Sequence, residues 1–261
     1  MHLPGSDRIN TDQIQNDFGV AHPSAHLRAT TTEIERQNIN VNVEYGQSIL
    51  NYIRSMEVNH TTNDCLIRHK ITPALRARMI DWKIEVLTNF KCDDQTFFLA
   101  VSLMDRYFKG KQEPREISDL HIIGVTCMFI ASKYEDIYPL KMKMVYEKIA
   151  HQKLAIEDIK ALELDILQTI NYQIPTPTPL DFLKVYLKEV LNIGHVGKTS
   201  LTKEEKEAIP TSSDTYEGIR LLIYKMAMYL GKMAMHDYEL SGRKPSLVGI
   251  GAFYVALKIC E

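Results

Sequence analysis

The run from Leu120 to Ser132 constrains the fold of this 261-residue chain more than any other segment, because its thirteen residues include no Asp, Glu, Lys or Arg. A membrane span needs about 20 apolar residues, so the run is too short for one. A helix that is apolar on nearly all sides belongs at the centre of a helical bundle. The sequence therefore predicts a bundle built around this helix.

The same pattern recurs near the C-terminal end of the sequence. Residues 123–133 match residues 248–258, and both segments keep an early glycine and a later aromatic-aliphatic-alanine block. A glycine at that position allows two helices to approach closely. The repeat predicts two similar helical bundles in tandem, each with the same kind of central helix.

Cap and proline signals place the other helices. Thr72-Pro73 and Thr178-Pro179 each join an N-cap residue to a proline at the first helical position. Further helices are expected from Asp93 or Asp94 to about Phe108, from Pro139, and over residues 156–170. No run alternates as a strand would, so the predicted fold class is all-α. The predicted division is a flexible polar tail over 1–41, a short helix over 42–60, a first bundle over 61–174, and a partial second bundle over 175–261 with a loop insertion at 192–215.

Four charged residues lie on otherwise apolar helix faces. Around each one, apolar residues recur at i+3 or i+4 spacing, which predicts that the charged group faces a buried surface. A lone buried charge costs several kcal/mol, so such a residue is expected to be paired or bound by a partner. Two cations and two anions predict two pairs. The four residues are Arg76, Asp105, Lys133 and Glu163.

Composition narrows the class of protein. A net charge of −2 gives no electrostatic case for nucleic acid or a membrane surface as the main partner. The four cysteines form no C-x-x-C motif, which argues against structural zinc and favours reduced thiols in the nucleus or cytoplasm. No secretory signal, catalytic constellation, metal site or cofactor motif is found, so we expect a protein that is not an enzyme.

Several motifs in fixed order resemble the cyclin family. They are LRARMIDWKIEV at residues 75–86, LMDRYF at 103–108, ASKYEDIYP at 131–139, and Glu163 in the fifth helix. The stripe of Tyr45, Ile49 and Tyr52 resembles the N-terminal helix of the mitotic A/B subgroup. The resemblance covers residues 42–261 and implies two five-helix cyclin boxes. The second box is short by two helices, which is expected to leave Phe253 and Leu257 partly uncovered.

The resemblance implies a regulatory subunit that binds and activates a cyclin-dependent kinase in mitosis. It assigns Arg76 and Asp105 to a buried structural pair, and Lys133 and Glu163 to contact with the kinase's regulatory helix. It adds apolar kinase contacts from Tyr134, Leu167 and Tyr172, and from the stripe of Tyr45, Ile49 and Tyr52. The alternative interpretation is that all of these residues only brace this chain internally.

The resemblance also implies a docking patch for substrates or inhibitors that carry a basic-x-leucine motif. Its residues are Leu75, Met79, Trp82, Glu85 and His121. Arg78 and Lys83 depart from the family pattern, and we expect both cations to weaken binding of a basic peptide. Two other functions stay open: a cyclin-fold transcription adaptor, which should be basic and carry a zinc ribbon, and a peptide-binding scaffold that acts without a kinase. The kinase, its substrates and the degradation signal are not specified by the sequence.

Overall fold

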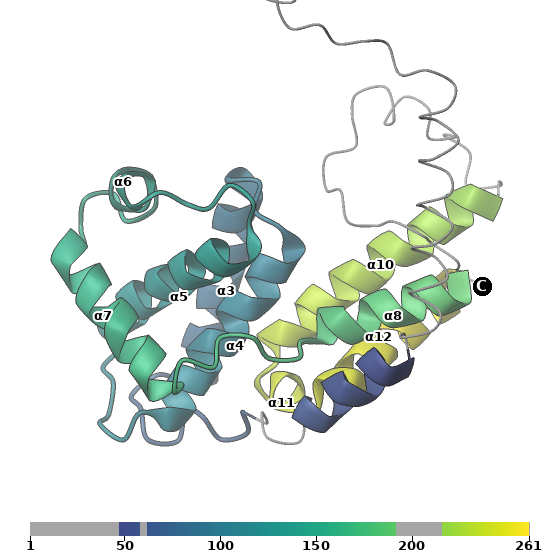
Figure 1. The fold of residues 1–261 in the computed structure, drawn as a ribbon, viewed down its shortest axis with the longest axis horizontal. Helices are drawn as coiled ribbons and strands as arrows, with labels where there is room; N and C mark the ends of the chain where they lie inside the picture. Colours follow the sequence, from purple (N-terminus) through teal and green to yellow (C-terminus); the bar gives the residue numbers. More distant parts are fainter. Residues whose placement is uncertain (1–46, 58–61, 192–215, 261) are drawn as a thin grey trace, which may run out of the picture. The chain divides into compact units, whose positions relative to one another are not determined.

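A computed structural model of the chain describes residues 47–57, 62–191 and 216–260 (Figure 1). The chain divides into two compact units, residues 1–52 and 53–261. Residues 47–52 of the first unit are helical, and in the second unit the helix continues through residue 57. Tyr45, the tail predicted over 1–41 and the insertion predicted over 192–215 lie outside the described residues. The domain boundaries stay predictions.

The second unit contains two groups of helices and, among its described residues, no β-strand. The first helix group comprises α3 (Pro73–Asn89), α4 (Asp94–Gly110), α5 (Asp119–Glu135), α6 (Met142–Met144), the π-helix η1 (Val145–Ile149) and α7 (Ile156–Thr169). The second helix group comprises α8 (Pro179–Leu191), α10 (Tyr216–His236), α11 (Tyr238–Ser241) and α12 (Pro245–Cys260). The prediction of an all-α fold is confirmed.

The predicted helix starts at Thr72, Asp93 and Thr178 are confirmed. The Thr72 side chain accepts a hydrogen bond from the backbone N–H of Leu75, and Asp93 caps α4 in the same way. At the start of α8 the Thr178 N–H donates to Asp181 Oδ2 at 2.7 Å. That bond to an acidic side chain three residues along is one half of a capping box.

The prediction that a helix begins at Pro139 is wrong, because α6 begins at Met142. Two contacts hold the chain extended before it. The Leu140 N–H donates to Ser132 Oγ at 2.9 Å, and the Leu140 side chain is buried. Lys141 then takes an extended conformation as the N-cap residue.

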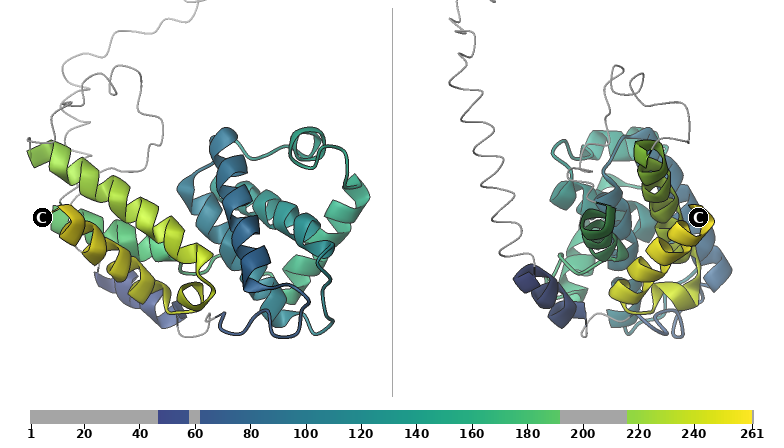
Figure 2. Two further views of the ribbon diagram at one scale, coloured as in Figure 1. Left: turned by 180° about the vertical axis from the view of Figure 1, so that it is seen from behind. Right: turned by 90° about the vertical axis from the view of Figure 1, so that its right-hand side faces the viewer.

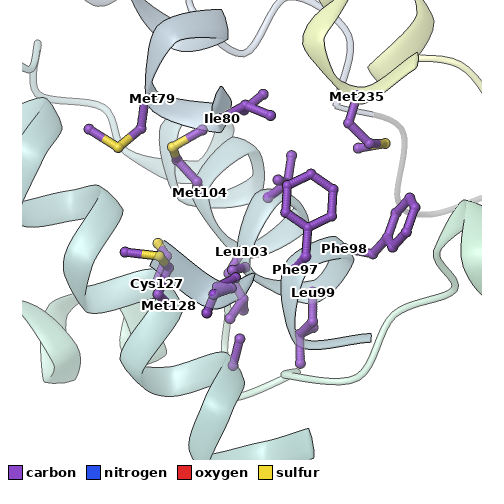
Figure 3. Packing of buried hydrophobic residues seen from close by; sticks show 14 of the residues in the cluster. Met79, Ile80, Phe97, Phe98, Leu99, Leu103, Met104, Cys127, Met128 and Met235 are labelled. Atoms are coloured by element: carbon purple, nitrogen blue, oxygen red, sulfur yellow. The ribbon is translucent and has the colours of Figure 1, made fainter. Parts of the chain in front are cut away.

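The central helix α5 is buried along its whole middle, from Ile123 to Ser132. Its side chains pack with those of α3 and α4 in a core that continues to Met235 of α10 (Figure 3). The matching helix α12 differs, because only five of its residues are buried. Phe253 is one of them, stacked on Tyr186 of α8, so the expectation of a partly uncovered side chain is wrong for Phe253, whereas Leu257 is half-buried.

Both repeat glycines sit where another element comes close, as predicted. A Cβ added at Gly124 would lie 2.3 Å from Met79 Sδ, and one added at Gly249 would lie 2.8 Å from the backbone oxygen of Pro179. Gly249 therefore lets α12 pack tightly on α8 (Figure 2). At Gly124 the close neighbour is the flexible side chain of Met79, which can move. The approach of α5 to α3 therefore depends less on a glycine than the approach of α12 to α8.

Candidate functional site

Arg76 and Asp105 form a bidentate ion pair inside the first helix group. Arg76 Nε donates to Asp105 Oδ1 at 2.8 Å and Nη2 donates to Oδ2 at 2.6 Å, with side-chain exposures of 0% and 2%. The third nitrogen, Nη1, donates to the backbone oxygen of Met235 at 2.9 Å. Burial disfavours the charged form of the guanidinium and by itself lowers the pKa of Arg76. The Asp105 carboxylate favours the charged form more strongly, so the pKa of Arg76 is raised. The pair faces no solvent and acts structurally.

Lys83 is a second buried cation, and its predicted place beside the docking patch is wrong. Its side chain is fully buried, with Nζ 3.0 Å from the backbone oxygen of Ala100 and 3.4 Å from Met104 Sδ. Burial lowers its pKa to about 8. Lys83 lies seven residues after Arg76 on the same face of α3, so the periodicity that singled out Arg76 also predicts that Lys83 is buried.

Lys133 and Glu163 form an ion pair between the end of α5 and the middle of α7. Their side chains are 40% and 19% exposed, so the expectation that both groups are buried is wrong for Lys133. The reason is that Lys133 lies in the last turn of α5, where the helix leaves the core. The Lys133 ammonium also lies 4.2 Å from the ring centroid of Phe129. This pair is accessible to a partner, unlike Arg76 and Asp105.

The apolar residues assigned to the same surface lie next to this pair in the chain or in the fold. Tyr134 follows Lys133 and is 49% exposed, and Leu167 lies one helical turn after Glu163. Tyr172 is 60% exposed, and its N–H donates to the backbone oxygen of Leu167 at 2.8 Å. Asn171 and Tyr172 have positive φ, so α7 ends in a Schellman motif that holds Leu167 and Tyr172 close together.

Sequence reasoning missed two exposed apolar residues, Ile137 and Tyr138. They are 89% and 91% exposed, and each end of their segment is held to the bundle. At one end Asp136 Oδ1 accepts from the Asp93 N–H at 2.8 Å, and at the other the Leu140 N–H bonds Ser132. No periodicity marks such residues. The only sequence signal is their position between a helix C-cap and a proline.

The docking-patch residues of α3 and α5 partly come together. The Trp82 and His121 rings have centroids 5.1 Å apart, Glu85 is exposed, and Leu75 is half-buried. Met79 is 9% exposed and packs on Gly124, so it contributes little accessible surface. Burial, and then the charges of Lys153 and His151, lower the pKa of His121. Arg78 is exposed, as expected.

In the unit that holds residues 47–52, Ile49 and Tyr52 are 51% and 65% exposed. Their assignment to a kinase stays a prediction, as does that of Tyr45. The described part of the chain holds no group of three His, Cys, Asp or Glu side chains placed to bind a metal ion. None of its helices is long and apolar enough to cross a membrane.

Comparison with known proteins shows which family this chain is similar to. The profile of the cyclin N-terminal domain matches residues 48–175. G2/mitotic-specific cyclin-B1 of Anguilla japonica is 29% identical over 219 residues, covering 84% of this chain and 47% of the relative. G2/mitotic-specific cyclin-B of Emericella nidulans is 27% identical over 220 residues, covering 84% of this chain and 40% of the relative. The chain thus spans about half the length of these relatives.

The fold comparison agrees with the sequence comparison. The X-ray structure of a viral cyclin from herpesvirus saimiri superimposes with a TM-score of 0.61 at 19% identity. The match covers 81% of this chain and 82% of the viral protein. The chain is therefore similar to the cyclin family over residues 48–175, and to mitotic B-type cyclins over 84% of its length.

Proposed function

We propose that this chain is the regulatory subunit of a cyclin-dependent Ser/Thr protein kinase in mitotic control. It binds the kinase through what we call the Lys133 surface: Lys133, Tyr134, Ile137, Tyr138, Glu163, Leu167 and Tyr172. It performs no chemistry itself. The observation that carries the proposal is the accessible ion pair bordered by exposed apolar side chains, because water-exposed residues such as Ile137 and Tyr138 contribute nothing to this chain's own core.

The Lys133 surface has the composition that helix recognition needs. Tyrosine and aliphatic side chains provide apolar area, and aromatic residues are enriched at protein interfaces. Lys133 provides donors that suit unsatisfied carbonyl groups at the C-terminal end of a helix, and Glu163 provides acceptors that suit unsatisfied N–H groups at an N-terminal end. A kinase helix docked here would be held by polar contacts at its end and by apolar contacts along its side.

Docking changes the kinase by population shift. A kinase samples arrangements in which its regulatory helix is in or out and its activation loop is closed or open. A subunit that binds the inward arrangement more tightly raises the population of that arrangement relative to the outward one. The increase equals the ratio of the subunit's affinities for the two arrangements. The activated kinase then forms its Lys–Glu ion pair and performs phosphoryl transfer.

The test is binding and activation of a cyclin-dependent kinase captured from cell extract. Lys133→Ala and Glu163→Ala should each lower the kinase affinity, because truncating one member of a desolvated charge contact costs about 2–5 kcal/mol. That corresponds to roughly 30-fold or more. Tyr138→Ala should also weaken binding. Lys70, which pairs with the exposed Glu116 at 2.7 Å, gives the control variant Lys70→Ala. If the three surface variants activate the kinase as well as the control Lys70→Ala does, this surface is not the kinase contact.

A second element of the proposal is recruitment of substrates or inhibitors through Leu75, Trp82, Glu85 and His121. The support is the half-exposed Trp82–His121 ring pair beside the exposed carboxylate of Glu85. An apolar side chain and a basic group of a short peptide fit these two features.

A further inference from the structure

Basic side chains border the docking patch on two sides. Arg78 is exposed and lies one helical turn before Trp82 on α3, at the i and i+4 positions that share a helix face. On the α5 side, Lys153 and His151 are exposed, and their charges act on His121. We call Arg78, His151 and Lys153 the basic rim. The Trp82–His121 ring pair therefore lies among basic residues that a ligand can reach.

The turn that carries two members of the basic rim is fixed to the first helix group. It follows the π-helix η1, which packs on α5. The Gln152 N–H donates to the backbone oxygen of Tyr146 at 2.8 Å. The Lys153 N–H donates to the backbone oxygen of Ala150 at 2.9 Å. These bonds hold the backbone of the turn, so the side chains of His151 and Lys153 start from defined positions beside α5.

The carboxylates of α3 leave the basic rim available to a ligand. No member of the rim forms an ion pair with another described residue. Asp81 lies 3.3 Å from His236 Nδ1 of α10, so its carboxylate is directed to the second helix group. Glu85 lies one turn after Trp82, on the other side of it from Arg78 along the helix. The patch thus has an acidic position at the Glu85 end of α3 and basic positions elsewhere around its rings.

We propose that the docking patch selects short peptides in which an acidic residue follows the apolar one, with the carboxylate bound by Lys153 and His151. This preference rests on the recruitment function proposed above and names the class of peptide. The basic residue of a basic-x-leucine motif precedes the leucine and meets Glu85, so the acidic residue is expected on the other side of the leucine. The basic rim attracts a carboxylate there and repels a second basic group, which gives discrimination between peptides.

Three labelled peptides test the preference. They share a basic residue and a leucine, and they differ only in the residue after the leucine, which is glutamate, alanine or lysine. Titration of the full chain at low salt should give the tightest binding for the glutamate peptide and the weakest for the lysine peptide. Each step should be about threefold, as expected for one exposed charge contact. The differences should shrink at high salt.

Charge reversal in the basic rim gives the second test. Lys153→Glu should weaken binding of the glutamate peptide and tighten binding of the lysine peptide, so that their order reverses. Lys160→Glu makes the same change of charge at an exposed position of α7 and should leave the order as in the wild type. The thermal unfolding midpoints of both variants should stay near that of the wild type, because both lysines are exposed.

Trp82→Ala separates the preference from docking itself. It should weaken all three peptides alike, because it removes the apolar contact that they share. If no peptide binds the wild-type chain, or if Trp82→Ala changes no affinity, the patch does not dock peptides and the preference is overturned with it. If Trp82→Ala weakens binding but the wild type binds the three peptides equally, or the lysine peptide most tightly, docking stands and the acidic preference is overturned. An order of affinities that Lys153→Glu leaves unchanged also overturns it.

Discussion

Arg76 and Lys133 each bond a carboxylate from a neighbouring helix, but the two pairs lie in opposite environments. The Arg76–Asp105 pair is at most 2% exposed, whereas Lys133 is 40% exposed. A buried pair must find its hydrogen-bond partners inside the protein, and each of the three nitrogens of the Arg76 guanidinium donates one hydrogen bond. An exposed pair is solvated and can exchange its partner for one on another protein.

The comparison teaches that the same residue types serve stability in one place and recognition in the other. A buried charge left without its partner is strongly destabilising, while exposed ion pairs contribute only about 0–1 kcal/mol to folding. Substitutions at the two pairs should therefore separate loss of folding from loss of binding. Lys83 tests the comparison further, because it is buried like Arg76 but its ammonium bonds a backbone oxygen and a thioether instead of a carboxylate.

The largest effect is expected for Arg76→Ala. Removing the guanidinium leaves Asp105 charged in the core, which should lower the free energy of unfolding by about 3–5 kcal/mol. Chemical denaturation of this variant beside Arg78→Ala, an exposed arginine of the same helix, measures the difference. Equal stability of the two variants would mean that the buried pair contributes nothing.

The next largest effect is expected at Lys83, where a substitution should raise the free energy of unfolding. Replacing Lys83 with methionine should stabilise the fold, because burial lowers the pKa of Lys83 to about 8 from its ordinary value of 10.5. Between these pH values the unfolded state binds more protons, so this group makes stability rise with pH. Below pH 8 the full penalty remains, about 3 kcal/mol.

Unfolding curves of wild type and Lys83→Met between pH 7 and pH 10 give the measurement. The difference in stability between the two proteins should be largest at pH 7 and shrink as the pH rises. A difference independent of pH would show that Lys83 does not change protonation with folding over this range.

A smaller effect on folding is expected at the exposed pair. Lys133→Ala should change the free energy of unfolding by less than about 1 kcal/mol, since solvent screens the charge. The same variant should lose kinase binding. Lys133→Ala should therefore weaken binding, whereas Arg76→Ala should weaken the fold. Thermal unfolding provides the check. A loss of stability as large as that of Arg76→Ala would mean that Lys133 is needed for the fold, as the buried pair is.

The smallest effect concerns Arg78, the exposed cation near the docking patch. A basic-x-leucine peptide should bind weakly, and Arg78→Ile should tighten its binding several-fold at low salt, because exposed like charges repel by only about 1 kcal/mol in water. The gain should shrink at high salt, where screening is stronger. Lys83→Met should leave the peptide affinity unchanged, because Lys83 faces the core. Equal affinities for wild type and Arg78→Ile at both salt concentrations would exclude a role for Arg78.

The helical fold was predictable because its signals are local. The cap residues Thr72, Asp93 and Thr178, the buried face of α5 and the repeat glycines all depend on spacing along one helix. Periodicity also identifies Lys83, but Lys83 was placed by its family position instead. The lesson is that the physical pattern of this chain takes precedence where it departs from the family.

The accessible parts of the site were less predictable. Periodicity assigns a residue to a helix face but does not tell where the helix end leaves the core, so Lys133 was expected to be buried. The extended segment with Ile137 and Tyr138 depends on two hydrogen bonds: Asp136 Oδ1 accepts one from the Asp93 N–H, and the Leu140 N–H donates one to Ser132 Oγ. Such tertiary contacts override the local helix signal of a proline.

The bond from Arg76 Nη1 to the Met235 carbonyl has a consequence for how the chain opens. Met235 belongs to α10, so a single guanidinium joins α3, α4 and a helix of the second group. A local fluctuation that exposes the end of α10 must break this bond. It then either breaks the ion pair with Asp105 as well or leaves Nη1 of the charged guanidinium without its acceptor. Amide hydrogen exchange near Met235 should therefore report on the integrity of the first helix group, and the two groups should unfold as one cooperative unit.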